Sequence, residues 1–154
     1  MKQDLKKLYS EIIKEHNENP FHFEKRENAG KTLKAYNPIC GDRFEVYVDS
    51  DQRTLKELHF HGFGCAISKA STSVLTKSLE GKQLKEALEL CDRFLHFINQ
   101  ELRDKELILS DDFLAFSGVH DFPERYDCAS LSWREMKNFL ESKSGVIDTK
   151  RPDK

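Results

Sequence analysis

The sequence has no long run of apolar residues. Its longest runs, such as Phe113-Leu114-Ala115-Phe116, are far shorter than the roughly 20 residues that a membrane-spanning helix needs. The N-terminal stretch Met1–Lys7 is charged and lacks the apolar segment of a secretory signal. We therefore expect no transmembrane segment, no membrane partner and a cytoplasmic location.

An excess of charge of either sign is also absent. Lys and Arg total 25 and Asp and Glu total 27, which leaves a formal net charge of -2. Proteins that bind nucleic acids normally carry a basic excess or a basic stripe, so we expect no nucleic-acid partner. Repeats and low-complexity tracts are missing as well, and a chain of 154 residues is typical of one domain. We place this domain at residues 1–141 and expect the polar residues 142–154 to form a frayed tail.

The hydrophobic pattern contains both helical and strand periodicity. Apolar residues recur at helical spacing in Lys2–His16, which predicts an amphipathic first helix. Strict alternation in Arg43–Val48 predicts a half-buried strand, and a short strand is expected at Thr32–Tyr36. After a turn the chain would return in an antiparallel strand with Leu58 and Phe60 on its inner face.

Further helices are expected after this hairpin. The segment Cys65–Leu79 is rich in small residues and predicts a helix that lies close to its neighbours. Lys82–Leu102 contains two short helical patterns, and Asp104–Val119 is expected to be a loop with a short helix. The last helix would open near Phe122-Pro123-Glu124, because proline suits a first helical turn. We expect the charged run Arg103–Glu106 to be solvated.

Cysteines are few, and the expected reducing compartment excludes a disulfide framework as their main role. The four are Cys40, Cys65, Cys91 and Cys128. They are more consistent with metal ligands, reactive thiols or core residues than with disulfides. Cys91 continues the apolar stripe of a predicted helix, which favours packing in the core.

The other three cysteines occur where a thiolate can act as a ligand. Cys40 and Asp42 lie two residues apart and would share one face of an extended segment. Cys65 would lie at a helix N-terminus, where the helix dipole favours the thiolate, and Cys128 is in a similar but weaker position. Three thiols and a carboxylate match the four ligands that zinc prefers. The intervals match no short zinc-finger pattern, however, so core packing is the alternative for at least one of the three.

Histidines offer alternative ligands. His59 and His61 alternate on the outer face of a predicted strand, where a metal could bind, but a solvated strand face already explains them. His120 lies eight residues before Cys128 and could approach as a substitute ligand, although a loop histidine usually has no such role. The remaining histidines are expected at the surface or on helix faces: His16, His22 and His96.

Three sequence blocks carry a family resemblance. They are Asn37–Asp42 (NPICGD), Gly62–Ser71 (GFGCAISKAS) and Phe122–Trp133 (FPERYDCASLSW), each with one cysteine. Together they resemble the signature blocks of the IscU/NifU-like superfamily of iron–sulfur cluster assembly proteins, and within it the SufU branch. The resemblance extends from the first predicted helix to about Leu140.

The resemblance implies an α+β fold, with a small antiparallel sheet, helices packed on one side and a site at one end of the sheet. It implies that Cys40, Asp42, Cys65 and Cys128 bind one zinc ion, and that Cys40 accepts sulfur from a SufS-type pyridoxal-phosphate-dependent cysteine desulfurase. Arg125 matches a position of the SufU motif and would offset charge or orient an acidic group. The sulfur would pass to downstream iron–sulfur assembly proteins, so the protein would be a persulfide acceptor rather than a stand-alone enzyme.

Departures from the scaffold pattern favour the SufU branch. IscU-type scaffolds have histidine immediately before the last cysteine and a Leu-Pro-Pro-Val-Lys stretch, where this chain has Asp127 and residues 118–123. The region between Gly81 and Cys128 is also long, as in SufU-type proteins. Two alternatives stand beside a sulfur acceptor. One is an IscU-like scaffold that holds an iron–sulfur cluster transiently on the same cysteines; the other is an interaction module with a purely structural zinc.

Overall fold

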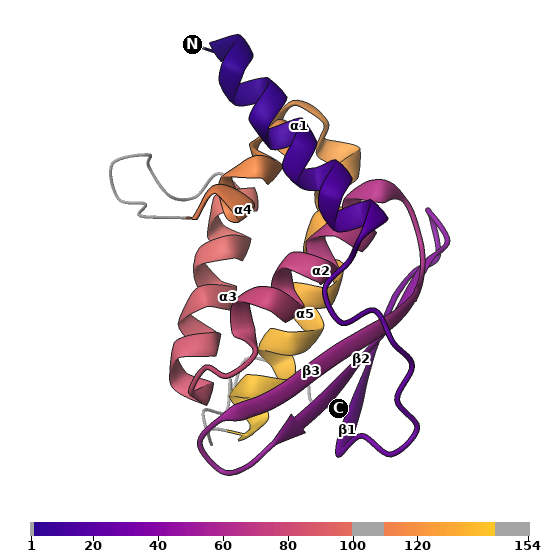
Figure 1. Cartoon of the computed structure of the whole chain (residues 1–154), viewed down its shortest axis with the longest axis vertical. Coiled ribbons are helices and arrows are strands. Elements are labelled where there is room, and N and C mark those ends of the chain that lie inside the picture. Colours follow the sequence, from indigo (N-terminus) through magenta and orange to yellow (C-terminus); the bar gives the residue numbers. More distant parts are fainter. Residues whose placement is uncertain (1, 100–109, 144–154) are drawn as a thin grey trace.

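The computed structural model describes residues 2–99 and 110–143 of the chain (Figure 1). Within these ranges the strands form a three-stranded antiparallel sheet in the order β1-β2-β3, with β1 at Lys31–Asn37, β2 at Asp42–Ser50 and β3 at Leu55–Phe63. The predicted hairpin and the additional short strand are therefore confirmed. The sheet is small, and one turn at each end of β2 joins it to its neighbours.

The helices are arranged in layers on one side of this sheet (Figure 1). The helical elements are α1 (Lys2–Glu18), α2 (Ala66–Leu79), α3 (Leu84–Ile98), α4 (Asp111–Leu114), the 3-10 helices η2 (Ala115–Asp121) and η3 (Pro123–Arg125), and α5 (Tyr126–Lys143). Helices α2 and α5 contact the sheet, while α1 packs on α2 and α3 packs on α5. The α+β fold predicted from the sequence is confirmed. No helix in the described ranges has both the length and the apolarity needed to cross a membrane.

Several boundaries differ from the sequence prediction. One continuous helix, α3, replaces the two short helical patterns, because the first pattern leads into the second without a break. A 3-10 turn precedes α5, whose first residue is Tyr126, and α5 extends to Lys143, two residues beyond the predicted domain end. The charged run Arg103–Glu106 and residues 144–154 of the predicted tail lie outside the described residues.

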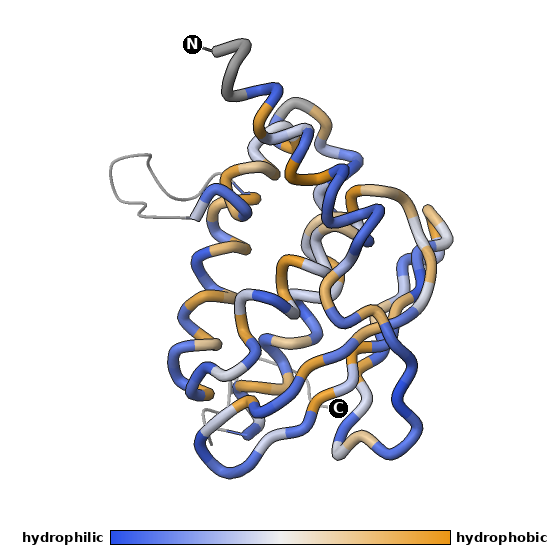
Figure 2. Tube along the Cα trace, in the orientation of Figure 1, coloured by the Kyte–Doolittle hydropathy of each residue, from blue (hydrophilic) through white to orange (hydrophobic). Residues whose placement is uncertain are grey.

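The inner face of the sheet follows from the alternation in the sequence. Val46 of β2 pairs with Leu33 of β1 and with Phe60 of β3, and all three side chains are buried against the helices. Hydrophobic and hydrophilic residues alternate along the strands in Figure 2. His61 is exposed on the other face, as predicted. Because the side-chain period of a strand is two, the pairing register is fixed by this buried row.

His59 contradicts the prediction of a solvated strand face. Its side chain is buried, and Nη2 of Arg26 donates to its Nε2 at 2.8 Å. The ring of His22 stacks on it, with 4.7 Å between ring centroids. The segment 22–24 forms a bridge to Phe60, the next residue of β3, and so runs along the edge of that strand. Burial, followed by the charge of Arg26, lowers the pKa of His59, which favours the neutral imidazole that accepts from Arg26.

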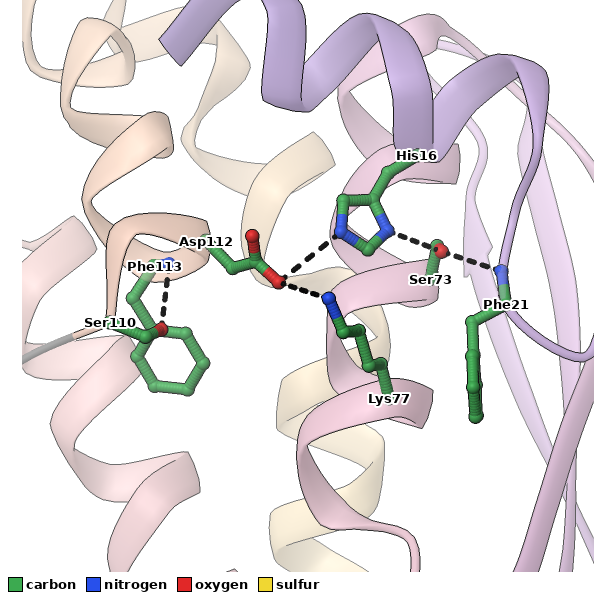
Figure 3. A network of polar contacts seen from close by, with 7 residues as sticks. All are labelled: His16, Phe21, Ser73, Lys77, Ser110, Asp112 and Phe113. Atoms are coloured by element: carbon green, nitrogen blue, oxygen red, sulfur yellow. Dashed lines mark hydrogen bonds and ion pairs between the residues drawn. The ribbon is translucent and has the colours of Figure 1, made fainter. Parts of the chain in front are cut away.

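His16 is also buried, so of the two positions predicted for it, at the surface or on a helix face, it has the second, on α1. Its Nδ1 lies 2.7 Å from Ser73 Oγ and its Nε2 lies 3.3 Å from Oδ2 of Asp112 (Figure 3). Lys77 Nζ lies 3.3 Å from the same carboxylate oxygen, and Ser73 Oγ also accepts the backbone N–H of Phe21. This network joins α1 and α4 to α2, which explains why a polar side chain is tolerated inside the molecule.

An aromatic cluster fills the space between α3, α4 and α5. The fully buried Trp133 stacks on Phe94 with 4.2 Å between ring centroids and meets Phe113 edge to face. Its Nε1 donates to Oγ of Ser71 at 2.9 Å, so the polar end of the ring has a partner. Cys91 is fully buried in the same core, as predicted, and burial raises the pKa of its thiol.

Candidate metal centre

The turn between β1 and β2 brings Cys40 and Asp42 to one end of the sheet. The N–H of Gly41 donates to the carbonyl of Asn37 at 2.8 Å, and Gly41 has a φ of 77°. Glycine adopts this left-handed conformation at little cost, so the chain can turn tightly here. Cys40 is exposed at the turn, whereas Asp42, the first residue of β2, is completely buried.

The two carboxylate oxygens of Asp42 have different surroundings. Oδ1 accepts the backbone N–H of Cys65 at 2.9 Å. Oδ2 is buried and has no hydrogen-bond partner among the described residues. An unpaired buried carboxylate oxygen is costly, and a bound cation removes that cost. The position of Oδ2 therefore fits a metal ligand.

Cys65 lies at the N-terminus of α2 as its N-cap residue. Its sulfur accepts the N–H of Ser68 at 3.5 Å, which satisfies one of the free amides of the first helical turn. The preceding Gly64 leaves the space that this arrangement needs, because a Cβ there would lie 2.6 Å from both Asp42 Oδ1 and Ser68 Oγ. The sequence predicts Cys65 as a ligand, but it does not predict that Gly64 and Ser68 contribute to this arrangement. The contact of Ser68 could have been predicted from its position three residues after the expected helix cap at Cys65.

Cys128 completes the closest group of ligand atoms. It is the third residue of α5, it is buried, and its sulfur lies 3.7 Å from the sulfur of Cys40. One ligand atom from each of Cys40, Asp42 and Cys128 lies within 4.8 Å of the other two. Within the described part of the chain, this is the group of three that could hold a metal ion.

Electrostatics connect Cys65 and Arg125 to this group. Burial raises the pKa of Cys128, and the adjoining Asp42 carboxylate and the sulfurs of Cys65 and Cys40 raise it further. The sulfur of Cys65, followed by a hydrogen bond to Cys128, raises the pKa of the exposed Arg125. All five predicted site residues therefore lie at one end of the sheet, with Cys65 beside the group of three. A cation bound among these ionisable groups would favour their charged forms.

The potential ligand atoms are cysteine sulfurs and a carboxylate oxygen. Zinc accepts both and is usually bound by four ligands in tetrahedral sites. His120 supplies no additional ligand here, because its Nε2 donates to the carbonyl of Phe97 at 2.7 Å and its ring packs against Phe97. The substitute-ligand alternative for His120 is thus not supported by its position.

Large apolar side chains are exposed around the cysteines. We call them the apolar rim, which consists of Tyr36 (52% exposed), Ile39 (89%), Phe63 (64%) and Phe122 (56%). Ile39 immediately precedes Cys40, and Phe63 lies two residues before Cys65. The sequence does not predict the exposure of any of the four. Exposed apolar groups that gather in one place are typical of interaction surfaces.

Two further features adjoin the centre. The guanidinium of Arg43 lies over the ring of Tyr36, 4.7 Å from its centroid, and Arg43 is opposite Phe63 in the strand register. A cavity of about 510 Å³ opens beside Cys65 and Arg125, with mostly apolar walls from α1, α2 and η2. The end of the sheet that carries the cysteines thus combines cationic and apolar surface.

Comparisons with known proteins agree with this arrangement. The sequence model of the family described as NifU-like N terminal domain matches residues 8–136. The zinc-dependent sulfurtransferase SufU of Bacillus subtilis is 32% identical over 142 residues, which cover 92% of this chain and 95% of the relative. The iron–sulfur cluster assembly scaffold protein IscU of Streptococcus pyogenes is 31% identical over 137 residues, 89% of this chain and 85% of the relative.

A solved structure shows the same similarity in three dimensions. A protein of Fervidobacterium islandicum, described as an iron–sulfur cluster assembly scaffold for the SUF system, superimposes with a TM-score of 0.77 at 31% identity. The match covers 86% of this chain and 96% of the other. The relatives thus include proteins with both kinds of name, sulfurtransferase and scaffold.

Proposed function

Because the chain belongs to the NifU-like N-terminal domain family, we propose that it is a zinc-bound sulfur acceptor in iron–sulfur cluster assembly. It takes persulfide sulfur from a SufS-type cysteine desulfurase through Cys40 and passes it to downstream assembly proteins in the cytoplasm. The observation that carries this proposal is the position of Cys40. Its thiol is exposed, yet it adjoins the buried Asp42 and Cys128 within one group of ligand atoms.

Cys40, Asp42, Cys65 and Cys128 would hold the zinc ion. When bound, zinc keeps its thiolate ligands deprotonated and limits their oxidation and unspecific exchange. The unpaired Oδ2 of Asp42 supports this assignment, because it is buried beside the sulfurs and has no hydrogen-bond partner in the described residues.

The sulfur-transfer step needs one accessible nucleophile. The Cys40 thiolate attacks the outer sulfur of the donor's persulfide, a new S–S bond forms on Cys40, and the donor's S–S bond breaks. The donor cysteine leaves as a thiolate, and the proton of the persulfide stays on the transferred sulfur. Cys128 is 1% exposed and is unsuitable for this attack, whereas Cys40 can be reached from solvent.

Arg125 contributes charge rather than sulfur. Three thiolates, one carboxylate and a divalent ion carry a net charge of -2, which the neighbouring guanidinium partly offsets. Its position against Cys65 and Cys128 supports this role. Because Arg125 is exposed, it can also pair with an acidic group of the docked desulfurase.

The apolar rim supports a protein rather than a small molecule as the sulfur donor. A partner that covers Ile39 and Phe63 would exclude water from the space around Cys40. The persulfide is reactive, so transfer within a covered interface limits its loss to solvent.

A desulfurase assay tests the proposal. The activity of the cognate enzyme is measured with wild-type protein, with Cys40→Ala, and with Cys91→Ala as a control whose thiol lies in the core. We expect strong stimulation by the wild type and by Cys91→Ala, and none by Cys40→Ala. Full stimulation by Cys40→Ala would contradict the assignment of Cys40.

The second candidate is a scaffold for a transient iron–sulfur cluster, which the similarity to the Streptococcus pyogenes protein favours. Thiolates also bind iron–sulfur clusters, so the residues would be the same. Protein purified without oxygen distinguishes the two functions. A colourless protein with near-stoichiometric zinc supports sulfur transfer, and a brown protein with labile sulfide supports a scaffold. A structural zinc alone predicts that no persulfide forms on Cys40.

A further inference from the structure

Hydrogen bonds hold the sulfur of Cys65 in place. The backbone N–H of Ser68 donates to it at 3.5 Å, and the Cys65 thiol donates to Ser68 Oγ at 3.6 Å. Ser68 is 1% exposed on the first turn of α2, so these groups do not face solvent. The sulfur of Cys40 contacts that of Cys128, and within the described part of the chain no amide or hydroxyl donates to it. The two thiols therefore differ in how firmly they are held.

The same turn also orients Asp42. The backbone amide of Cys65 binds Oδ1 of Asp42, which leaves Oδ2 for a cation. Oδ1 of Asp42 and Oγ of Ser68 both converge on Gly64, where a Cβ would lie 2.6 Å from each. One short segment, residues 64–68, thus fixes two of the four proposed ligands relative to each other.

We propose that Ser68 is a positioning residue that keeps the sulfur of Cys65 on the metal, so that Cys40 is the thiolate free to exchange. The proposal rests on the proposed function, because it requires a metal at these ligands. The Ser68 hydroxyl donates to the carbonyl of Cys65 at 3.1 Å and so fixes the first turn of α2, whose backbone amide donates to the sulfur. Groups that orient a metal ligand in this way typically strengthen metal binding. Cys40 has no such support and is exposed, which suits a sulfur that must leave and react.

Packing alone is the competing explanation for Ser68. Buried hydroxyls that donate to a backbone carbonyl recur along α2, as in Thr72 and Thr76. Ser130 provides a matched control in α5. It is completely buried, close in sequence to Cys128, and its hydroxyl donates to the carbonyl of Tyr126 at 2.9 Å.

Site-resolved alkylation tests the proposal without the desulfurase. Zinc-loaded protein is treated with iodoacetamide, and the rate at each cysteine is followed by peptide mass spectrometry. We expect wild type to be modified first at Cys40. Ser68→Ala should lower the zinc affinity by about tenfold in competition with a chelator and raise the rate at Cys65 by a similar factor. The rate at Cys40 should not change, Ser68→Thr should restore protection, and Ser130→Ala should behave as wild type.

Each other outcome overturns a definite part of the proposal. If Cys65 is as well protected from alkylation in Ser68→Ala as in wild type, or if Ser130→Ala loses as much of this protection as Ser68→Ala, the role of Ser68 is overturned. The proposed function then remains intact. A wild type in which zinc protects no cysteine overturns the metal site and both proposals together. If circular dichroism shows that Ser68→Ala does not fold, Ser68→Thr and Ser68→Val decide, because they differ mainly in the hydroxyl. Equal protection in that pair also overturns the role of Ser68.

Discussion

Oδ1 of Asp42 accepts the backbone N–H of Cys65 at 2.9 Å, so β2 and the N-terminus of α2 share one buried carboxylate. The hydrogen bond joins the segment that contains Cys40 and Asp42 to the segment that contains Cys65. The carboxylate therefore has a structural function through Oδ1 and a ligand function through Oδ2. The two functions can be separated by substitution.

Asp42→Asn and Asp42→Ala should have different effects. Asn keeps an oxygen for the Cys65 amide but loses the charge, so we expect near-normal stability and at least tenfold weaker zinc binding. Ala also leaves the Cys65 amide without a partner, which should lower the free energy of unfolding by about 1–3 kcal/mol. Chelator competition and urea unfolding measure the two quantities. Wild-type zinc affinity in Asp42→Asn would show that the carboxylate is no ligand.

Gly62→Ala should strongly destabilise the fold. Gly62 has a φ of 143°, and a Cβ there would collide with the carbonyl of Arg43 and lie 2.8 Å from the Cα of Phe44. We expect a loss of more than about 1 kcal/mol in the free energy of unfolding. Gly118→Ala is the control, because no atom lies within 4 Å of the added Cβ. An equal effect of the two substitutions in urea unfolding would contradict the strand geometry.

Asp112 should make the stability dependent on pH in the acid range. The hydrogen bond from His16, with the charge of Lys77 as a smaller cause, lowers the pKa of the Asp112 carboxyl. A lowered folded pKa stabilises the fold above the unfolded value, about 3.9 for Asp, and this contribution is lost as the pH falls through the folded pKa.

Asp112→Asn should therefore be less stable than wild type at pH 7 and lose less stability between pH 4 and the more acid folded pKa. Urea unfolding at a series of pH values measures this difference. Asp111→Asn is the control, since Asp111 is its exposed neighbour on the same helical turn. Parallel pH curves for wild type and Asp112→Asn would refute the contribution of the His16 contact.

Trp133 and Ser71 should be energetically coupled. Trp133→Phe removes the indole N–H that Ser71 accepts, and Ser71→Ala also removes a hydroxyl that donates to the carbonyl of Ala129. We expect each single variant to lose about 1–3 kcal/mol and the pair to show a coupling of about 1 kcal/mol. Thermal and urea unfolding of the four proteins in a double-mutant cycle measure this value. Additive effects would mean that the hydrogen bond contributes nothing to stability.

The sequence predicted the parts of the fold that depend on local periodicity. Alternation in β2 identified the inner row that contains Val46, and the small residues of α2 predicted its close packing. The burial of His16 and His59 was not predicted, because it depends on distant segments. His16 binds Ser73 and Asp112, which lie 57 and 96 residues away, and His59 is covered by a connector without any hydrophobic period.

The candidate site shows the same limit. Three blocks with one cysteine each were sufficient to predict which residues come together. Cys65 binds Asp42 through its backbone amide. Every residue except proline has such an amide, so this hydrogen bond cannot be predicted from residue identity. The exposure of Ile39 was equally unpredictable, because an isoleucine in a turn is apolar whether or not it is covered.

The short distance between the sulfurs of Cys40 and Cys128 has a consequence for the protein without metal. At 3.7 Å, a small shift of the turn that carries Cys40 brings the two atoms to the bond length of a disulfide. A two-electron oxidant such as a peroxide or a disulfide would then join Cys40 to Cys128 in the metal-free protein, with loss of both thiol protons, and the proposed acceptor thiol would no longer be available. Metal occupancy would in this way protect the site from self-inactivation, and a reductant would restore the thiol before metal can bind again.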